Sequence, residues 1–277
     1  MKTVLVLHGY SQNAVIFSKR IGALRKECKN VEFVFIDAPH ILQPADLVFN
    51  STRLEELGLR AEVQANEASI AVESDPSLTP RAWWKPNLER TAAYGLEESI
   101  MVVKEALLKR KFDGVFGFSQ GAAFAAVVAA LLENPEVYPP FLVDGKPPHP
   151  PFEFCVAVSG FKVEDPFCDP LWEKGFNTPT LHVIGKTDVV VVEERSHKLL
   201  EVSHTKRVEE HLGGHFVPSK GPWRKFLAAY LANPSGDHRS PEAGAVTPVS
   251  SYSGTVTPQP EYAATGSGSL TPATLKL

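Results

Sequence analysis

The pentapeptide GFSQG at residues 117–121 constrains the fold more than any other part of the sequence. It lies between an apolar run at 112–118, typical of a buried β-strand, and an alanine-rich run at 122–132, typical of a helix. A serine placed in this way predicts a nucleophile elbow, a tight strand-to-helix turn that lifts Ser119 out of the sheet and exposes it to substrate. The turn closes only if the residues two positions before and after the serine are very small, and both are glycine.

Short apolar runs alternate with helix-like segments over most of the 277 residues, of which 43% are hydrophobic. Several runs are almost continuous Val, Leu, Ile and Phe, as strands buried on both faces should be. Predicted strands cover residues 2–7, 31–36, 114–118, 154–159, 180–184 and 205–210. Predicted helices cover residues 14–28, 95–109, 120–132, 193–202 and 222–232. This alternation predicts an α/β fold with a mostly parallel central sheet and helices on both faces.

Three segments depart from the alternation. Residues 39–94 and 134–151 are long and rich in proline or charge, which is typical of functional loops, lids or insertions. We therefore expect a lid-like insertion within a domain that covers residues 1–233. In residues 234–277 Ser, Thr, Pro, Gly and Ala dominate, which predicts a disordered tail because little apolar surface is available for burial. This tail is either inert or a target of proline-directed kinases, since serine or threonine precedes proline at positions 240, 247, 257 and 271.

Charge and cysteine content narrow the class of protein. The net charge of −4 lacks the electrostatic footprint of nucleic-acid binding, and no lysine or arginine cluster compensates for it. The first apolar run, residues 3–7, is too short for a signal-peptide core or a membrane span. Three cysteines without a secretory signal favour reduced thiols. These features predict a protein that has no nucleic-acid partner and no membrane span. Its predicted location is the cytoplasm, with the nucleus as the alternative.

A serine nucleophile needs a base, which is usually a histidine. The serine hydroxyl is a poor nucleophile until its proton is taken, and the histidine in turn needs an acid that fixes its tautomer. After a nucleophile elbow the chain order is serine, acid, histidine. His215 follows a Gly-Gly pair just beyond the last predicted strand, so it is the predicted base, with His211 as the next candidate. A metal site on His211 and His215 is disfavoured because the glycines break the helix that would align the pair.

Asp188 is the predicted acid. It stands just beyond the strand predicted at 180–184 and one element before His215, at the edge of the sheet where a triad acid belongs. The alternative role for this residue is a helix cap for the segment that begins near residue 193. Weaker candidates for the acid are Asp165, Asp169, Glu193 and Glu194.

Backbone N–H groups must also stabilise the oxyanion of a tetrahedral intermediate. One donor in such sites belongs to the residue after the nucleophile, here Gln120, and the other to a loop that follows an early strand. His8-Gly9 directly follows the first strand and lets the backbone come close to the substrate. We therefore predict the N–H groups of Gln120 and Tyr10 as the oxyanion hole, with Ser11 as the alternative to Tyr10.

Three aromatic residues are candidates for the wall of an apolar acyl pocket. Trp83 and Trp84 lie in the predicted lid, and Phe17 lies in the first predicted helix. A wall of this kind would favour substrates with a hydrophobic acyl chain. Packing of the insertion against the sheet is the alternative role for these side chains.

Seven stretches in this order resemble the fungal serine hydrolase family (FSH-type esterases) of the α/β-hydrolase superfamily. They are LHGY at 7–10, FIDAP at 35–39, RAWW at 81–84, GFSQGA at 117–122, VSGF at 158–161, TPTLHVIG at 178–185 and GGH at 213–215. The resemblance spans residues 1–232 and implies an α/β-hydrolase fold with Ser119 as nucleophile, Asp188 as acid and His215 as base. It also implies a carboxylesterase or thioesterase without metal or organic cofactor. Some members release polyketide chains from a synthase, which would then be a partner.

Other functions remain open at this point. The same triad would serve an acyltransferase, in which an alcohol or amine replaces water, and the fold alone would serve a non-catalytic binding protein. A dinucleotide-binding oxidoreductase would need Gly-x-Gly-x-x-Gly after an early strand, and residues 7–11 do not supply it. The sequence favours a small-molecule ester or acyl-thioester substrate and gives no indication of the oligomeric state.

Overall fold

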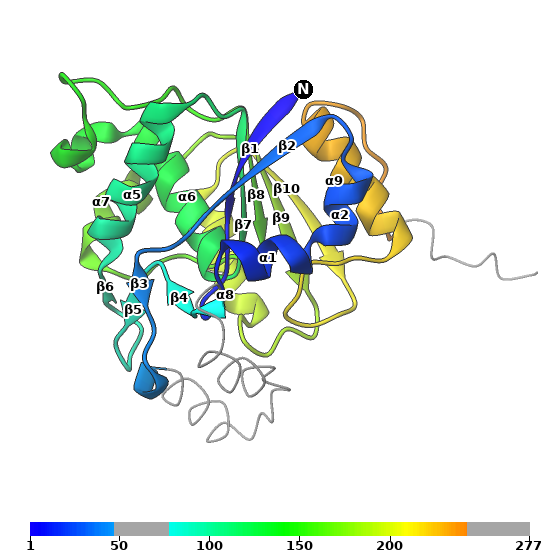
Figure 1. The fold of residues 1–277 in the computed structure, drawn as a ribbon, viewed down its shortest axis with the longest axis horizontal. Coiled ribbons are helices and arrows are strands. Elements are labelled where there is room, and N and C mark those ends of the chain that lie inside the picture. Colours follow the sequence, from blue (N-terminus) through cyan, green and yellow to red (C-terminus); the bar gives the residue numbers. More distant parts are fainter. Residues whose placement is uncertain (47–77, 243–277) are drawn as a thin grey trace, which may run out of the picture. The chain divides into compact units, whose positions relative to one another are not determined.

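The computed structural model describes residues 1–46 and 78–242, in which six parallel strands form one sheet (Figure 1). The strand order is β10-β9-β8-β7-β1-β2. The strands are β1 (Lys2–Leu7), β2 (Val31–Ile36), β7 (Gly114–Phe118), β8 (Phe154–Val158), β9 (Thr180–Gly185) and β10 (Lys206–His211). The predicted parallel sheet is confirmed, and each of the six predicted strands agrees with an observed one to within one residue at either end.

Helices cover both faces of this sheet (Figure 1). They are α1 (Ala14–Arg20), α2 (Gly22–Glu27), α5 (Leu96–Lys109), α6 (Gln120–Glu133), α7 (Asp169–Lys174), α8 (Glu193–Val202) and α9 (Gly221–Ala232), with short 3-10 turns at Pro135–Val137, Pro139–Phe141 and Pro166–Cys168. Helices α1, α2 and α9 share one hydrophobic core, and α5 to α8 share the other. Within the described residues no helix is both long and apolar enough to span a bilayer.

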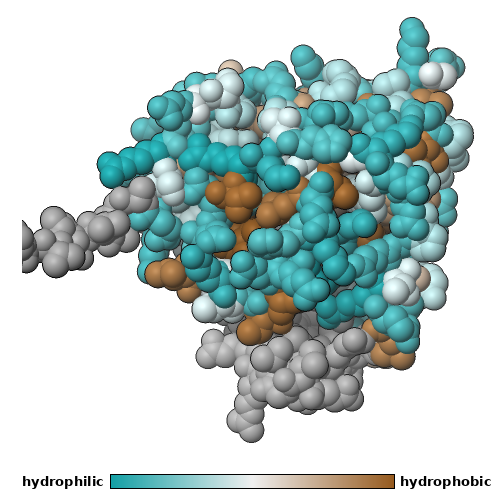
Figure 2. All heavy atoms as spheres, turned by 180° about the vertical axis from the view of Figure 1, so that it is seen from behind, coloured by the Kyte–Doolittle hydropathy of each residue, from teal (hydrophilic) through white to brown (hydrophobic). Residues whose placement is uncertain are grey.

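The side chains of strand β1 contribute to both hydrophobic cores. Successive side chains of a strand point to opposite faces of a sheet. Val4 and Val6 therefore enter the core beneath α1, α2 and α9, whereas Leu5 and Leu7 enter the core beneath α5 and α6. All four side chains are fully buried, which is why this run contains no polar residue. From behind (Figure 2) the exterior is mostly hydrophilic with separate hydrophobic patches, as expected when the apolar residues fill two internal cores.

The strand register brings the predicted site residues to one edge of the sheet. Leu7 pairs with Gly117, Gly117 with Ala157, and Val158 with Val183, so that the carboxyl ends of β1, β7, β8 and β9 lie side by side. Ligands of open parallel sheets bind outside this edge. The segments that carry Ser119, Asp188 and His215 all leave the sheet there.

The region predicted as an insertion contains two small antiparallel sheets. Strand β3 (His40–Ile41) pairs with β4 (Arg81–Ala82), and β5 (Lys85–Pro86) pairs with β6 (Ala93–Tyr94). An ion pair of 2.7 Å joins Lys85 Nζ to Asp46 Oδ2 across the gap in sequence. Residues 47–77 of the predicted lid lie outside the described residues.

The folded unit extends beyond the predicted boundary at residue 233. Residues 233–242 are called here the C-terminal strap. The Ser240 hydroxyl donates to Glu209 Oε2 at 2.6 Å, and Glu242 Oε1 accepts the indole N–H of Trp223 at 2.7 Å. The first nine residues assigned to the disordered tail, 234–242, are therefore part of this unit. Composition alone missed these contacts because they depend on partners in distant elements. The remaining tail, residues 243–277, lies outside the described residues.

Candidate active site

The turn between β7 and α6 has the strained geometry of a nucleophile elbow. Ser119 has φ 54° and ψ −120°, a conformation that non-glycine residues adopt only when their surroundings enforce it. A Cβ added to Gly117 would lie 2.2 Å from the carbonyl oxygen of Gly121, and one added to Gly121 would lie 2.2 Å from that of Leu7. Both positions therefore require glycine. The Ser119 N–H donates to Val158 O at 2.8 Å and ties the elbow to the end of β8.

Three side chains predicted to cooperate form a continuous chain of hydrogen bonds. His215 Nε2 lies 2.9 Å from Ser119 Oγ, and His215 Nδ1 lies 2.7 Å from Asp188 Oδ2. A carboxylate accepts, so Nδ1 carries the proton of the neutral imidazole and Nε2 presents its lone pair to the serine hydroxyl. This is the arrangement in which a histidine takes a proton from serine.

The environment of Asp188 keeps its carboxylate charged. Burial raises the pKa of this carboxyl, but the hydrogen bond and charge interaction with His215 and the N–H of Val191 outweigh it, so that the pKa lies below its ordinary value. Oδ1 accepts the N–H groups of Val190 and Val191 at 2.9 and 2.8 Å, which leaves Oδ2 for His215. Ser159, a buried residue with φ 50° that sequence patterns did not single out, also lowers this pKa, although its Oγ makes no hydrogen bond of ordinary geometry within the described residues.

The loops that carry Asp188 and His215 are bound to each other by their backbones. Thr187 N donates to Gly213 O at 3.1 Å, just before Asp188 on one loop and His215 on the other. Strand β9 ends in Gly185, where an added Cβ would lie 2.6 Å from Gly213 O and 2.5 Å from Gly214 O. Close approach of these two loops therefore depends on Gly185 and sets the distance between the carboxylate and the imidazole.

The segment after β1 borders the nucleophile, as the oxyanion-hole prediction requires. A Cβ on Gly9 would lie 3.4 Å from Ser119 Cβ, so the backbone there runs alongside the elbow. Gln120 is the first residue of α6, and an N–H in the first turn of a helix has no acceptor within that helix. Tyr10 follows Gly9, and Ser11 has φ 60°. The assignment of the Gln120 and Tyr10 N–H groups to an oxyanion stays a prediction.

Comparison with known proteins identifies the family. A family model described as "Serine hydrolase (FSH1)" matches residues 1–227. The chain belongs to this FSH1 serine hydrolase family. Esterase OVCA2 of Danio rerio is 35% identical over 240 residues, which are 82% of this chain and 95% of the relative.

Two solved structures show that this FSH1-family chain shares their fold. Esterase PE8 is 20% identical with a TM-score of 0.54, over 83% of this chain and 91% of that one. Acyl-protein thioesterase 2 of Zea mays is 20% identical with a TM-score of 0.50, over 83% of this chain and 94% of that one. The predicted α/β-hydrolase fold is confirmed.

In this FSH1-family protein the side chain of Gln120 has a role that sequence patterns did not indicate. Its Oε1 accepts the N–H of Trp83 at 2.9 Å and its Nε2 donates to Trp84 O at 2.8 Å. The Trp83 indole donates to His8 O at 2.8 Å, and Ser99 Oγ donates to Trp83 O. Gln120 and Ser99 therefore hold the Trp83–Trp84 backbone beside the elbow, and His8 O holds the Trp83 indole.

His8 itself is a buried structural residue. Its Nε2 accepts the N–H of Ala38 at 3.1 Å, while Nδ1 lies 2.8 Å from Gly9 O, to which it donates. Burial lowers the pKa of His8 to about 4, so the imidazole is neutral at neutral pH and keeps one donor and one acceptor. This pair of bonds shapes the segment in which the predicted Tyr10 donor lies.

The three aromatic residues predicted as a pocket wall are core residues. Trp83 is fully buried with its ring 4.8 Å from that of Phe124, and Phe17 is 1% exposed with its ring 5.8 Å from that of Phe118. Trp84, 4% exposed, packs edge-on against Phe161. Packing, the alternative that the sequence left open, accounts for these contacts, because the side chains are enclosed by neighbouring elements.

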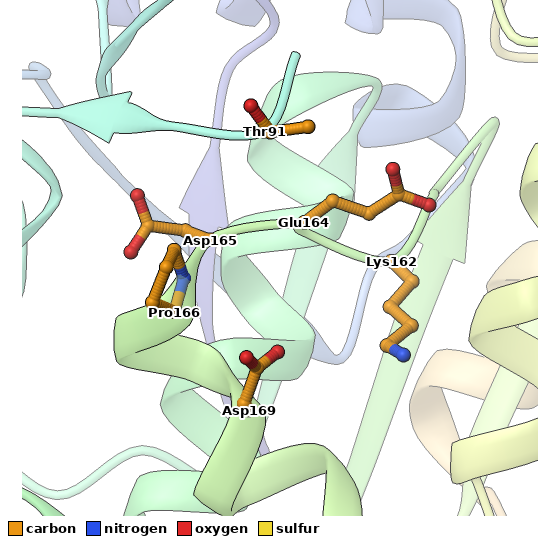
Figure 3. Close-up of a pocket in the computed structure, with 6 residues that line it drawn as sticks. All are labelled: Thr91, Lys162, Glu164, Asp165, Pro166 and Asp169. Atoms are coloured by element: carbon orange, nitrogen blue, oxygen red, sulfur yellow. The ribbon is translucent and has the colours of Figure 1, made fainter. Parts of the chain in front are cut away.

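Among the described residues, the other candidate acids and the other candidate base form no hydrogen bond with Ser119 or His215. Asp165 Oδ1 caps the turn Pro166–Cys168 by accepting the N–H of Phe167 at 2.8 Å, and its Oδ2 accepts the N–H of Ala93 in β6 at 2.6 Å. Asp165 and Asp169 line a surface depression of about 310 Å³, together with Thr91, Lys162, Glu164 and Pro166 (Figure 3). Glu193 and Glu194 occupy the first turn of α8.

His211, the other candidate base, has partners of its own. Its Nδ1 accepts the N–H of Gly213 at 3.2 Å, and its ring packs against Phe216 and Trp223.

We expect the substitution Gly185→Ala to disable the site without removing a chemical group. The new methyl group would push against two carbonyl oxygens of the histidine loop and displace His215 from Asp188. A displacement near 1 Å costs on the order of 10²-fold in rate. The measurement is kcat/KM for a p-nitrophenyl ester, with Gly22→Ala as the control because an added Cβ at Gly22 meets nothing within 4 Å. Equal activity of Gly185→Ala and wild type would contradict the role of this contact.

Proposed function

We propose that this FSH1-family serine hydrolase cleaves carboxylic esters or thioesters through an acyl-serine intermediate. The observation that carries the proposal is the chain of hydrogen bonds from Ser119 through His215 to Asp188. Ser119 Oγ attacks the carbonyl carbon while His215 Nε2 takes the hydroxyl proton and then passes it to the leaving group. Water attacks the acyl-serine with His215 again as base, and the free acid leaves.

The remaining residues of the site have electrostatic roles. Asp188 holds the imidazole in the productive tautomer and stabilises the imidazolium that forms when the proton is taken. The N–H groups of Gln120 and Tyr10 stabilise the negative oxygen of the tetrahedral intermediate, and each such donor contributes on the order of 10² to 10³ in kcat. The side-chain bonds of Gln120 to the Trp83–Trp84 backbone keep its own N–H in place for this role.

Similar proteins support both kinds of acyl substrate. The relative from Danio rerio is named an esterase, and the structure from Zea mays is named an acyl-protein thioesterase. A series of p-nitrophenyl esters and acyl-CoA thioesters of matched chain length, compared by kcat/KM, separates the two. A preference for thioesters would favour release of acyl chains from a synthase. A free hydroxylamine or alcohol acceptor added to the same assay would reveal acyl transfer by its product.

A fluorophosphonate probe tests the activated serine independently of the natural substrate. The probe reacts only with a hydroxyl made nucleophilic by its surroundings. We expect labelling of Ser119 in the folded wild-type protein, located by peptide mass, and none after heat denaturation. A folded protein that neither reacts with the probe nor hydrolyses any member of the ester and thioester series would be a non-catalytic binding protein, and the proposal would fail.

A further inference from the structure

The C-terminal strap is attached to the sheet through a nearly buried carboxylate. Glu209, on the edge strand β10, has a side chain that is 8% exposed. Its Oε2 accepts the hydroxyl of Ser240 at 2.6 Å, and its Oε1 accepts Nε and Nη2 of Arg207 at 2.9 and 2.6 Å. Arg207 also donates to His238 O of the strap at 2.6 Å. The Ser240 hydroxyl and the positive charge of Arg207 therefore stabilise the carboxylate of Glu209.

Ser240 precedes Pro241, and both residues are partly exposed in a segment without regular secondary structure. We propose that Ser240 is the phosphorylation site of an ATP-dependent, proline-directed protein kinase, and that the phosphate detaches the strap from β10. In the transfer Ser240 Oγ attacks the γ-phosphorus of ATP, the new O–P bond forms, and the bond to the β-phosphate oxygen breaks to release ADP. A base of the kinase accepts the hydroxyl proton.

Electrostatics decides the direction of the effect. The phosphate removes the donor that Glu209 uses and adds about −1.5 to −2 charges at pH 7 beside this carboxylate. Arg207 neutralises one negative charge and is already bound to Glu209 by two hydrogen bonds. Arg239, the neighbour of Ser240 in the strap, supplies one further positive charge, whereas Glu242 adds a negative one. Like-charge repulsion beside a buried carboxylate therefore outweighs the attraction of the arginines.

A chain of contacts connects the strap to the loop that carries His215. Glu242 of the strap accepts the indole N–H of Trp223, and the Trp223 ring lies 5.7 Å from that of His211. His211 ends β10 and accepts the N–H of Gly213 at 3.2 Å. We expect phosphorylation to loosen this loop and to lower the ester hydrolysis proposed above. That last step depends on the proposed function, whereas release of the strap does not.

Phosphorylation of the folded, full-length chain is the first test. A purified proline-directed kinase with ATP acts on a variant in which Thr247, Thr257 and Thr271 are alanine, so that Ser240 is the one remaining Ser-Pro or Thr-Pro site in residues 234–277. Within residues 234–277 we expect peptide mass mapping to place one phosphate, on Ser240, and none when Ser240→Ala is added. If the kinase modifies a synthetic peptide of residues 235–246 but not the folded protein, the inference is overturned.

Hydrogen exchange tests the release of the strap. We expect the phosphorylated protein and the variant Ser240→Glu to show at least tenfold faster amide exchange in residues 206–211 and 233–242 than the wild type. Ser235→Glu is the matched control, because Ser235 is exposed in the same strap and bonds only to Asn233 within it. Adding Glu209→Gln to Ser240→Glu should restore slow exchange, since it removes the repelling charge. Unchanged exchange in Ser240→Glu, or no recovery in the double variant, would contradict the proposal.

The exchange experiment and the activity assay test different parts of the proposal, so their outcomes can be told apart. With p-nitrophenyl esters we expect kcat/KM of Ser240→Glu to fall at least threefold while that of Ser235→Glu stays at the wild-type value. If the wild type hydrolyses no ester or thioester, the proposed function fails and the exchange data still decide the fate of the strap. If exchange rises but activity is unchanged, the coupling of the strap to the His215 loop is wrong.

Discussion

Replacing Ser119 by alanine is expected to lower kcat for ester hydrolysis by about six decades, the loss seen when a member of a serine triad that acts as a unit is removed. The change deletes the atom that forms the acyl bond and leaves the elbow intact, because alanine tolerates the positive φ no worse than serine does. Initial rates with a p-nitrophenyl ester, together with fluorophosphonate labelling, measure the effect. Both signals should disappear while the melting temperature stays close to that of the wild type.

The control for this experiment is Ser18→Ala. Ser18 lies on α1, is partly exposed, and donates only to Val15 O of its own helix. It should retain full activity and full labelling. Wild-type turnover in Ser119→Ala would remove Ser119 from the mechanism and, with it, the acyl-serine intermediate.

The substitution Asp188→Asn is expected to lower kcat by about 10⁴ without disturbing the position of His215. The structure determines how the new amide must lie. Oδ1 accepts the N–H groups of Val190 and Val191, so the carbonyl oxygen of asparagine must take that place. Its NH₂ group then faces His215 Nδ1, which must become an acceptor, and the imidazole proton moves to Nε2. The base can no longer accept the proton of Ser119.

Asp165→Asn is the matched control for this second prediction. Asp165 also accepts two backbone N–H groups, but it lies beside the surface depression shown in Figure 3 and does not contact His215. Its kcat should stay within about threefold of the wild type, because the partly buried Asp165 makes its two hydrogen bonds outside the Ser119–His215–Asp188 chain. Comparable losses in Asp165→Asn and Asp188→Asn would mean that the assay reports general destabilisation and would refute the assigned role of Asp188.

Much of the fold and the core of the site could be predicted because local pattern encodes them directly. Buried parallel strands are short apolar runs, and the residue after each carboxyl end lies at one edge of the sheet. Ser119 was predicted from the glycines of its turn, and Asp188 and His215 from their places beyond strand ends. These side chains can form hydrogen bonds because β7, β9 and β10 end at the same edge of the sheet, and the loops after β9 and β10 bring Asp188 and His215 to Ser119 past the end of β8.

Features that depend on contacts between distant segments could not be predicted. The side-chain bonds of Gln120 to Trp83 and Trp84 leave no trace in either local sequence, and the two-residue strands β3 to β6 are too short to show a period. The helix predicted over 14–28 divides at Ile21, where α1 ends and α2 begins, although the apolar spacing continues through the break. Polar composition likewise predicts a disordered tail from residue 234, because the strap is held by hydrogen bonds and by the His238 ring, whose partners lie in distant elements.

The two hydrogen bonds between the Gln120 side chain and the Trp83–Trp84 backbone have an evolutionary consequence. At one end of the interval 47–77 the chain is anchored by the ion pair of Asp46 with Lys85, and at the other end it returns to a segment clasped by the residue next to the nucleophile. Lengthening or replacing that interval therefore leaves both anchors where they are. We expect this interval to vary in length and sequence among members of the family, whereas position 120 keeps its glutamine.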